Sequence, residues 1–203
     1  YYWLDPDYLA IYLLDVSGHG LGAALPSVSI LNLLRSQSLP DVNFYQPDAV
    51  LRALNEVFQM GDQNNRYFTI WYGVYNQTKR QLVYASAGHP PAVLIPGTFT
   101  QSSIECKLLK SPDIPIGIFP DTKFGSHRCE IEKGSTLYIF SDGAYEISCP
   151  DDHIWGLEAF IQLLADRWQS EQFNLDDILQ DIQAINTSQT FEDDLSLLQI
   201  NFD

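Results

Sequence analysis

Three short acidic motifs lie far apart in this sequence, and each adjoins an apolar run with the composition of a β-strand. They span residues 15–20, 141–143 and 192–196, with the sequences Asp-Val-Ser-Gly-His-Gly, Ser-Asp-Gly and Glu-Asp-Asp-Leu-Ser. A glycine beside a strand-end carboxylate leaves the carboxylate oxygens uncovered. Carboxylates that converge from distant strands supply the hard oxygen ligands that Mg²⁺ and Mn²⁺ prefer. The motifs therefore predict a metal site of the kind that activates water for attack on a phosphate.

Each candidate carboxylate also has an ordinary structural explanation. Asp15 could simply end its strand or cap the helix that follows, and Asp142 with Gly143 has the composition of a hairpin turn. Asp193 and Asp194 precede a strand, where paired acidic residues are often solvated or cap another element. One of this pair could instead bind a metal while its neighbour supports the site. The residues alone leave both interpretations open at each position.

Histidine and cysteine give weaker signals. His19 and His89 lie in glycine-rich segments, where a structural hydrogen bond is a commoner role than metal ligation. The three cysteines include no Cys-x-x-Cys spacing, which argues against both a zinc site and a disulfide framework. The sequence also lacks a Walker-type loop and a Gly-x-Ser-x-Gly motif. These features fit a reducing compartment, and we expect a cytoplasmic location.

Length and composition indicate a globular domain with an acidic surface. The chain has 203 residues, of which 45% are hydrophobic and 13% aromatic. The net charge of −15 disfavours binding to nucleic acid or to an anionic membrane surface. No apolar stretch reaches the ~18 residues of a membrane span, so we expect no membrane insertion. The opening residues Tyr1-Tyr2-Trp3-Leu4 are typical of a strand interior, which predicts an N-terminally truncated fragment of a longer protein.

Hydrophobic periodicity and turn residues predict hairpins and helices in groups. Apolar runs on either side of Asp5-Pro6-Asp7 predict a β-hairpin over residues 1–14. An amphipathic helix is expected over about 21–39, with Pro26 tolerated only near its first turn. The residues at helical spacing in it are Leu25, Val28, Leu31, Leu34 and Arg35. Further helices are expected from residue 46 to a stop at Gly61, and at 157–168 and 175–185, with strands at 67–75, 81–87, 92–95, 135–141 and 195–200 and irregular chain over 96–121. This grouping predicts an α+β fold with antiparallel sheets.

Taken in order, five segments resemble the SpoIIE/RsbU-type serine phosphatases of the metal-dependent PPM phosphatase superfamily. They are Asp-Val-Ser-Gly-His-Gly at 15–20, Ala-Gly-His-Pro-Pro at 87–91, Ile-Pro-Ile-Gly-Ile at 114–118, Ser-Asp-Gly-Ala-Tyr-Glu at 141–146 and Asp-Asp-Leu-Ser at 193–196. Their order and spacing agree across nearly the whole chain. The resemblance implies a PPM-type phosphatase domain over residues 1–203, built as an α-β-β-α sandwich of two antiparallel sheets flanked by helices.

The resemblance also implies an activity. Proteins of this type hydrolyse phosphoserine or phosphothreonine on a signalling protein by means of metal-activated water, with two Mn²⁺ or Mg²⁺ ions in the complete domain. The usual bacterial substrate is a phosphorylated anti-sigma-factor antagonist. An upstream sensor or receiver domain is expected in the full-length protein.

The resemblance can be carried over residue by residue. It implies that Asp15 is a bridging metal ligand and that the backbone carbonyl of Val16 adds another. Asp142 corresponds to a ligand of one metal, and Asp193 corresponds to the ligand of the last motif. Asp194, in the place of a neighbouring polar residue, is retained as a metal-binding candidate. Asp15, Asp142 and Asp193 are the residues expected to support catalysis.

One departure from the family pattern leaves a second hypothesis open. The family normally carries Gly-Gly-Asp-x-x-Asp in the strand just before this chain's first residue, and that stretch supplies another metal ligand. In a hairpin centred on Pro6, the residue opposite Asp15 lies about two to four positions before Tyr1. A domain without that ligand would be a non-catalytic phosphatase-like signalling or binding module. Gly88 and His89 match a further family signature, which we interpret as structural support.

Overall fold

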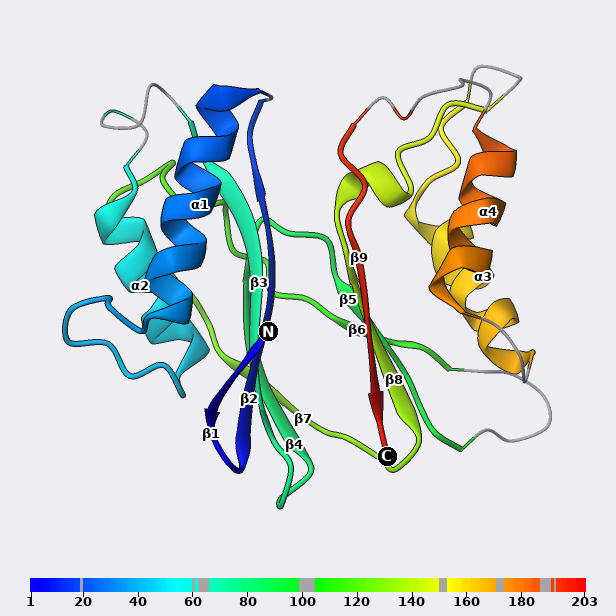
Figure 1. Cartoon of the computed structure of the whole chain (residues 1–203), viewed down its shortest axis with the longest axis horizontal. Helices are drawn as coiled ribbons and strands as arrows, with labels where there is room; N and C mark the ends of the chain where they lie inside the picture. Colours follow the sequence, from blue (N-terminus) through cyan, green and yellow to red (C-terminus); the bar gives the residue numbers. More distant parts are fainter. Residues whose placement is uncertain are drawn as a thin grey trace. The chain divides into compact units, whose positions relative to one another are not determined.

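The computed structural model of the protein describes residues 1–18, 20–59, 61, 66–98, 105–149, 153–170, 174–186, 191 and 193–203. Within these residues it is an α+β fold with two antiparallel sheets and four α-helices (Figure 1), which confirms the predicted fold class. The chain divides into two compact units. Unit 1 comprises Tyr1–Pro91 with Leu109–Ile131, and unit 2 comprises Ala92–Leu108 with Glu132–Asp203.

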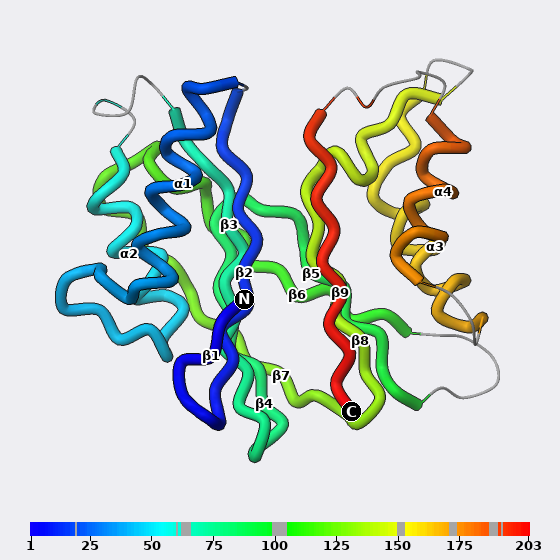
Figure 2. The backbone as a smooth tube through the Cα atoms, viewed as in Figure 1, coloured from blue at the N-terminus to red at the C-terminus, as the bar shows by residue number. Residues whose placement is uncertain are grey.

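Unit 1 is built on a five-stranded antiparallel sheet with the strand order β1-β2-β3-β4-β7. The strands are β1 (Tyr2–Asp5), β2 (Tyr8–Val16), β3 (Phe68–Asn76), β4 (Gln81–Ala87) and β7 (His127–Glu130). The predicted hairpin of β1 and β2 is present, as Figure 2 shows, with Tyr2 opposite Ala10. Asp5 closes its turn, because Oδ1 accepts hydrogen bonds from the backbone N–H groups of Asp7 and Tyr8. Aromatic and β-branched residues dominate β3, as expected for a buried strand.

Two helices, α1 (Leu21–Arg35) and α2 (Pro47–Val57), cover one face of this sheet (Figure 1). Their fully buried residues include Ile30 and Leu34 of α1 and Leu51 and Leu54 of α2. These side chains share a hydrophobic core with residues of β2 and β3. Helix α2 begins at Pro47, where proline is well tolerated. It ends at Val57, before the expected stop at Gly61.

The prediction for α1 was wrong in two respects. The helix ends at Arg35 rather than near residue 39, and much of its expected apolar face is on the surface. Leu25 is 68% exposed and Val28 is 56% exposed, whereas Ile30 and Leu34 are buried. Apolar residues occur all round this helix, so their spacing could not select the buried side. Pro26 lies six residues into the helix, beyond the first turn, where it removes one backbone hydrogen bond.

Unit 2 is built on a four-stranded antiparallel sheet with the strand order β6-β5-β8-β9. The strands are β5 (Ala92–Ile95), β6 (Lys107–Leu109), β8 (Ser135–Phe140) and β9 (Leu197–Phe202). Helices α3 (Leu157–Gln169) and α4 (Leu175–Ile185) contribute Phe160, Leu164, Ile178 and Ile182 to its hydrophobic core. Strand β6 corrects the prediction of irregular chain over 96–121, and β7 was not predicted. Both have only three or four residues, too few for periodicity to indicate a strand.

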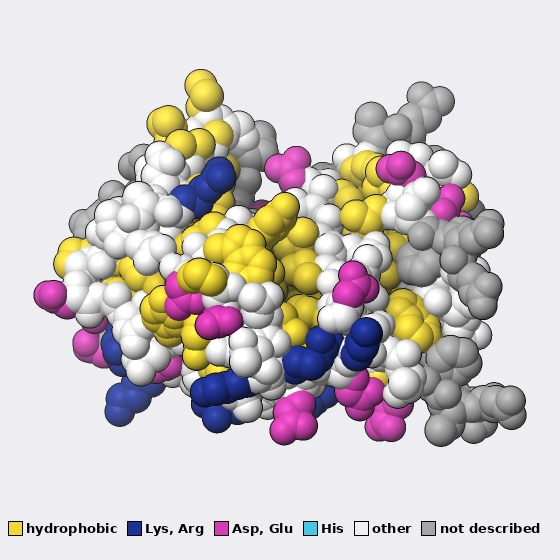
Figure 3. Space-filling model, turned by 60° about the horizontal axis from the view of Figure 1, so that its bottom comes forward, with side chains coloured by type: hydrophobic (Ala, Val, Ile, Leu, Met, Phe, Trp, Pro, Cys, Tyr) yellow, Lys and Arg dark blue, Asp and Glu magenta, His cyan; other side chains and the backbone are white. Residues whose placement is uncertain are grey.

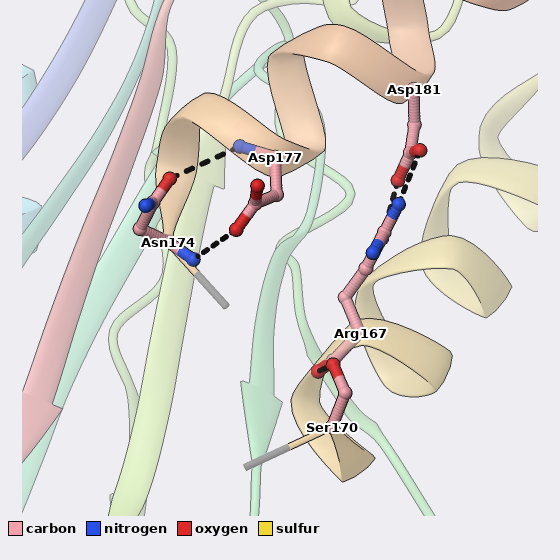
Figure 4. A network of polar contacts seen from close by, with 5 residues as sticks. All are labelled: Arg167, Ser170, Asn174, Asp177 and Asp181. Atoms are coloured by element: carbon pink, nitrogen blue, oxygen red, sulfur yellow. Dashed lines mark hydrogen bonds and ion pairs between the residues drawn. The ribbon is translucent and has the colours of Figure 1, made fainter. Parts of the chain in front are cut away.

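Polar contacts fix the pairing of α3 with α4 (Figure 4). The guanidinium group of Arg167 in α3 donates two hydrogen bonds of 2.5 Å to the Asp181 carboxylate in α4. Asn174 and Asp177 form a reciprocal capping box at the start of α4, which satisfies two N–H groups of its first turn. The Arg167–Asp181 contact thus joins the two helices, whereas the capping box stabilises only the start of α4.

Acidic side chains are spread among basic and polar ones on the face shown in Figure 3. This distribution fits the expectation that most of them solvate the surface. None of Cys106, Cys129 and Cys149 forms a disulfide within the residues that the structure describes. Among the helices that the structure describes, none has the length and apolarity needed to cross a membrane.

Candidate metal centre

Asp15 and Val16 are the last two residues of β2, at the end of a strand anchored in the core. They pair with Thr69 and Phe68 of β3. Val16 is buried, and Asp15 is partly exposed. The ladder to β3 fixes the backbone at this position, so the Asp15 carboxylate and the Val16 carbonyl are attached to a rigid element. This is the placement that the first acidic motif predicted.

The turn after Val16 is tied to the residues that precede β3. The Ser17 N–H donates to the Tyr67 carbonyl (3.0 Å), and the Tyr67 N–H donates to Ser17 Oγ (3.1 Å). The Nη1 atom of Arg66 donates to the Ser17 carbonyl at 2.7 Å. Gly18 follows with φ of +86°, a conformation that favours glycine. Three hydrogen bonds thus hold the turn after β2 against the dipeptide Arg66-Tyr67.

Helix α1 begins directly after this turn, and its N-cap is Gly20, with no side-chain cap. The N–H groups of Ala23 and Ala24 donate to the Gly20 carbonyl. Gly20, and not Asp15, is therefore the N-cap residue of α1. His19, the remaining residue of the first motif, lies outside the described residues.

The Gly88-His89 signature contacts β3, the strand that pairs with the strand carrying Asp15. His89 is buried, and its Nδ1 atom is 3.0 Å from Oγ1 of Thr69, the residue paired with Asp15. Gly88 has φ of +65°, and a Cβ atom there would lie 2.4 Å from Cγ of Pro115. Two family signatures, 87–91 and 114–118, are therefore in direct contact. These contacts fit the interpretation of Gly88 and His89 as structural support.

Asn55 of α2 holds the segment around 114–118 in place. It is only 1% exposed. Its Nδ2 donates to the carbonyl groups of Phe119 and Pro120, and its Oδ1 accepts from the Gly117 N–H at 2.8 Å. A buried amide with all of these partners is well satisfied. This role is only weakly indicated by residue type, because an Asn inside an apolar helix face has many possible partners.

Asp142 lies at the end of β8, where it begins a short 3-10 helix, Asp142–Ala144. Its backbone carbonyl accepts from the N–H groups of Tyr145 (2.9 Å) and Glu146 (2.8 Å), and its Oδ1 accepts from the Gly143 N–H (3.0 Å). The chain therefore turns into a helical segment and not back along β8. The hairpin explanation of the Asp-Gly pair is thus wrong, and the carboxylate remains partly exposed.

Ser141 joins the second acidic motif to the third. It is 2% exposed; its Oγ donates to the Asp194 carbonyl (2.9 Å) and accepts from the Ser196 N–H (2.9 Å). Its own N–H donates to the Ser196 carbonyl (3.0 Å). A Cβ atom at Gly143 would lie 2.7 Å from the Asp194 carbonyl oxygen. Residues 141–143 and 193–196 are therefore packed backbone against backbone.

This packing brings Asp142 close to the segment of Asp193 and Asp194. Both of the latter side chains are exposed, and the Asp194 N–H donates to Asp193 Oδ1 at 2.8 Å. The register of β8 with β9 requires this proximity. Phe140 pairs with Leu197, the second motif directly follows Phe140, and the third motif directly precedes Leu197. Glu192, the first residue of the third motif, lies outside the described residues.

Tyr145 stands beside these carboxylates as a neutral hydroxyl. Burial, with a smaller contribution from the negative charges of Glu146 and Asp142, raises the pKa of Tyr145 to about 12. It therefore stays protonated across the physiological pH range. Tyr145 can donate a hydrogen bond near Asp142 but cannot act as a base there.

The ligand candidates are divided between the two units. Asp15 and Val16 belong to unit 1, whereas Asp142, Asp193 and Asp194 belong to unit 2. No group of three His, Cys, Asp or Glu side chains placed to hold a metal occurs within the residues that the structure describes. The donor set nevertheless fits a hard cation, since it consists of carboxylate and carbonyl oxygens at strand ends.

Comparison with known proteins identifies the family. A family model described as "Stage II sporulation protein E (SpoIIE)" matches residues 5–203. The chain belongs to the SpoIIE family. The match confirms the expected resemblance to the SpoIIE/RsbU-type family. Phosphoserine phosphatase RsbU of Bacillus subtilis (strain 168) is 32% identical over 142 residues, covering 70% of this chain and 40% of RsbU. The chain thus spans about two fifths of the length of that SpoIIE-type relative.

Solved structures share the fold of this SpoIIE-family chain. The SiaA-PP2C domain of Pseudomonas aeruginosa superposes with a TM-score of 0.80 at 19% identity, covering 98% of this chain and 78% of that domain. RsbX, solved in complex with magnesium, superposes with a TM-score of 0.68 at 20% identity, covering 98% of this chain and 83% of RsbX. At these identities the likeness supports the α+β fold alone.

Two residues of the site were missed by reasoning from sequence. From the sequence, Ser141 beside Asp142 was only a weak nucleophile candidate, although a small polar residue at the end of an apolar strand often bonds to an adjacent backbone. Arg66 was treated as part of a polar stretch. An arginine just before a strand gave no indication that it would reach the exit of β2, which is 49 residues away in sequence.

Proposed function

We propose that this chain is a metal-dependent protein serine/threonine phosphatase domain, formed by residues 1–203. The observation that carries the proposal is the Ser141 linkage, which holds Asp142 against the segment of Asp193 and Asp194 at the end of one strand and the start of another. It is supported by membership of a family with a relative named phosphoserine phosphatase. A rigid pair of carboxylate segments suits metal ligation better than it suits a solvated loop.

The proposed metal ligands are the side chains of Asp15, Asp142 and Asp193 and the carbonyl oxygen of Val16, with Asp194 beside them. The expected ions are two Mn²⁺ or Mg²⁺. When bound, they would lower the pKa of a coordinated water and offset the charge of a phosphate. The residues of the chain keep the ligand oxygens oriented, because each ligand adjoins a backbone position fixed by ladder or turn hydrogen bonds.

No protein nucleophile is required in this proposal. Ser141 is the serine nearest to the carboxylates in sequence, but its hydroxyl already donates to one backbone group and accepts from another. Cys129 and Cys149 are buried, and burial raises the pKa of the Cys106 thiol, which disfavours its thiolate form. Water is therefore the proposed attacking group, and we expect no phosphoenzyme.

The substrate proposed is a phosphorylated signalling protein of the anti-sigma-factor antagonist type, and the location proposed is the cytoplasm. An upstream sensor or receiver domain in the full-length protein belongs to the same proposal. These finer points rest on the resemblance of the five sequence segments. The negative surface charge supports a protein substrate over nucleic acid.

Phosphate release from a phosphoserine peptide tests the proposal. In the full-length protein we expect hydrolysis in Mn²⁺, loss of it on addition of EDTA, and recovery when Mn²⁺ is returned. The Asp142→Asn variant serves as the matched control, since its amide oxygen can still accept from the Gly143 N–H and so preserves the local fold. A folded protein with no metal-dependent phosphate release would favour the non-catalytic signalling module instead.

A further inference from the structure

The guanidinium group of Arg66 lies over the exit of β2 and the first turn of α1. In addition to its bond with the Ser17 carbonyl, it occupies the space beside two glycines. A Cβ atom at Gly18 would lie 2.6 Å from Nη1 of Arg66, and one at Gly22 would lie 2.4 Å from Nη2. Val16, Pro26, Phe58 and Phe68 line the same hollow as Arg66. Apolar surface of this kind suits the aliphatic part of an arginine side chain.

We infer that Arg66 is a positioning residue, which holds the backbone after Asp15 and Val16 in the geometry needed for metal ligation. The N–H, hydroxyl and carbonyl groups of Ser17 are all bonded to Arg66 or Tyr67. The peptide that joins Val16 to Ser17 carries the Val16 carbonyl, so restraining Ser17 also restrains the orientation of that oxygen. A hydrogen bond from a charged donor is shorter and stronger than a neutral one, and the Arg66 bond is of this type.

Glycine at position 22 is part of the same arrangement. Gly22 lies in the first turn of α1 and has no positive φ, so its backbone does not require glycine. The space beside it is taken by Arg66, whose Nη2, Cζ and Nε atoms would all lie within 3.3 Å of an added Cβ. Alanine at this position would displace the guanidinium from the Ser17 carbonyl while improving the helix propensity of α1. Arg66, Gly22 and Ser17 therefore form a unit that joins the ligand strand to α1.

The effect of Arg66 on metal ligation rests on the proposed function. The restraint that Arg66 places on Ser17 can be tested in the protein without metal. In the metal-free protein, amide hydrogen exchange at Ser17 and Tyr67 should be faster in Arg66→Ala than in wild type. Arg52→Ala is the control, because it removes one exposed positive charge from α2 of the same unit. Unchanged exchange at Ser17 and Tyr67 would overturn the inference.

Mn²⁺ affinity distinguishes a positioning role of Arg66 from a simple effect of its charge. The two explanations predict changes in affinity of opposite direction when Arg66 is removed. Removing a cation near a metal site should tighten Mn²⁺ binding if only charge matters. Loss of a group that orients a ligand should weaken binding, typically about 10–100-fold. We expect calorimetry to show at least about tenfold weaker binding in Arg66→Ala than in Arg52→Ala. Equal or tighter binding in Arg66→Ala would contradict a positioning role.

A double-mutant cycle shows whether Gly22 acts through Arg66. Gly22→Ala alone should weaken Mn²⁺ binding about as much as Arg66→Ala while leaving the melting temperature unchanged or higher. In the Arg66→Ala background it should have no further effect on Mn²⁺ affinity. An equal loss in both backgrounds would show that Gly22 acts by another route and would overturn the proposed unit.

The same variants separate this inference from the proposed function. If Arg66→Ala accelerates exchange at Ser17 but wild-type protein binds no Mn²⁺, the positioning contact exists and the phosphatase proposal fails. If Mn²⁺ binding is retained and only the KM for a phosphopeptide rises, Arg66 contacts the substrate and the positioning role is overturned.

Discussion

Substitution of Gly143 by alanine probes the contact between the two carboxylate segments of unit 2. The added Cβ would lie 2.7 Å from the Asp194 carbonyl oxygen and 3.1 Å from the Asp194 carbonyl carbon. Real Cβ atoms essentially never approach another atom within 3.0 Å, so the segments must separate by at least about 0.3 Å. The opposing atoms belong to backbone and cannot rotate away. Overpacking of this kind costs about 1–3 kcal/mol of unfolding free energy.

The displacement matters more for activity than for stability. Catalytic geometry must be held to about 0.5 Å, and errors near 1 Å can cost about 100-fold in rate. Because the forced displacement is at least about 0.3 Å, we expect Gly143→Ala to lower metal-dependent phosphopeptide hydrolysis by roughly three- to tenfold. The melting temperature should fall by roughly 2–4 °C for each kcal/mol lost, as expected for a chain of this length.

Hydrolysis rates and thermal melts of Gly143→Ala and Gly61→Ala check this expectation. Gly61 is the matched control, because an added Cβ there meets no atom of the described residues within 4 Å. Gly61→Ala should retain the activity and melting temperature of wild type. Wild-type activity and stability in Gly143→Ala would refute the argument that backbone contact positions the Asp142 and Asp193 carboxylates.

Three further predictions concern the carboxylates, the thiols and the partly buried Tyr145. Asp142→Asn and Asp193→Asn should each cut hydrolysis by about 100-fold or more while circular dichroism stays unchanged, because each removes negative charge from the proposed ligand set; near wild-type turnover in either variant would remove that residue from the site. Alkylation of the exposed part of Cys106 should leave activity intact whereas EDTA abolishes it, and the reverse pattern would indicate cysteine chemistry. Because the pKa of Tyr145 is raised to about 12 from its ordinary value of 10.0, the folded state holds this proton more tightly than the unfolded chain. Its contribution to stability should be complete below pH 10 and lost between about pH 10 and 12, as urea unfolding at a series of pH values would show; constant stability over that interval would contradict the burial argument.

Much of the fold could be predicted from local patterns. The β1–β2 hairpin followed from Asp5-Pro6-Asp7, and the start of α2 followed from Pro47. Helix α1 was harder, because apolar residues on all of its sides gave no indication that Ile30 and Leu34 would be buried. Strands β6 and β7 were too short to produce a periodic signal.

The candidate site also has features that could be predicted from the sequence and features that could not. Asp15 and Asp142 were placed at strand ends by the apolar runs before them, and the structure confirms those positions. Contacts between distant segments could not be predicted, because the Ser141 bonds depend on the register of β8 with β9. The reach of Arg66 to the Ser17 carbonyl depends likewise on where β3 begins beside β2. Residue type indicates which groups could bind a metal, whereas tertiary register decides which backbone groups hold them in position.

Line broadening by Mn²⁺ in amide NMR spectra tests most directly whether the metal binds at the acidic motifs. Small additions of Mn²⁺ should first remove the amide signals of Ser17, Gly143 and Asp194. The signals of Ser135 and Phe202, paired at the opposite end of β8 and β9, should persist, because that end lies about 17 Å along the strands. Loss of the motif signals with persistence of this pair is the result we predict. Unchanged motif signals, or equal loss at Ser135 and Phe202, would contradict metal binding at these motifs.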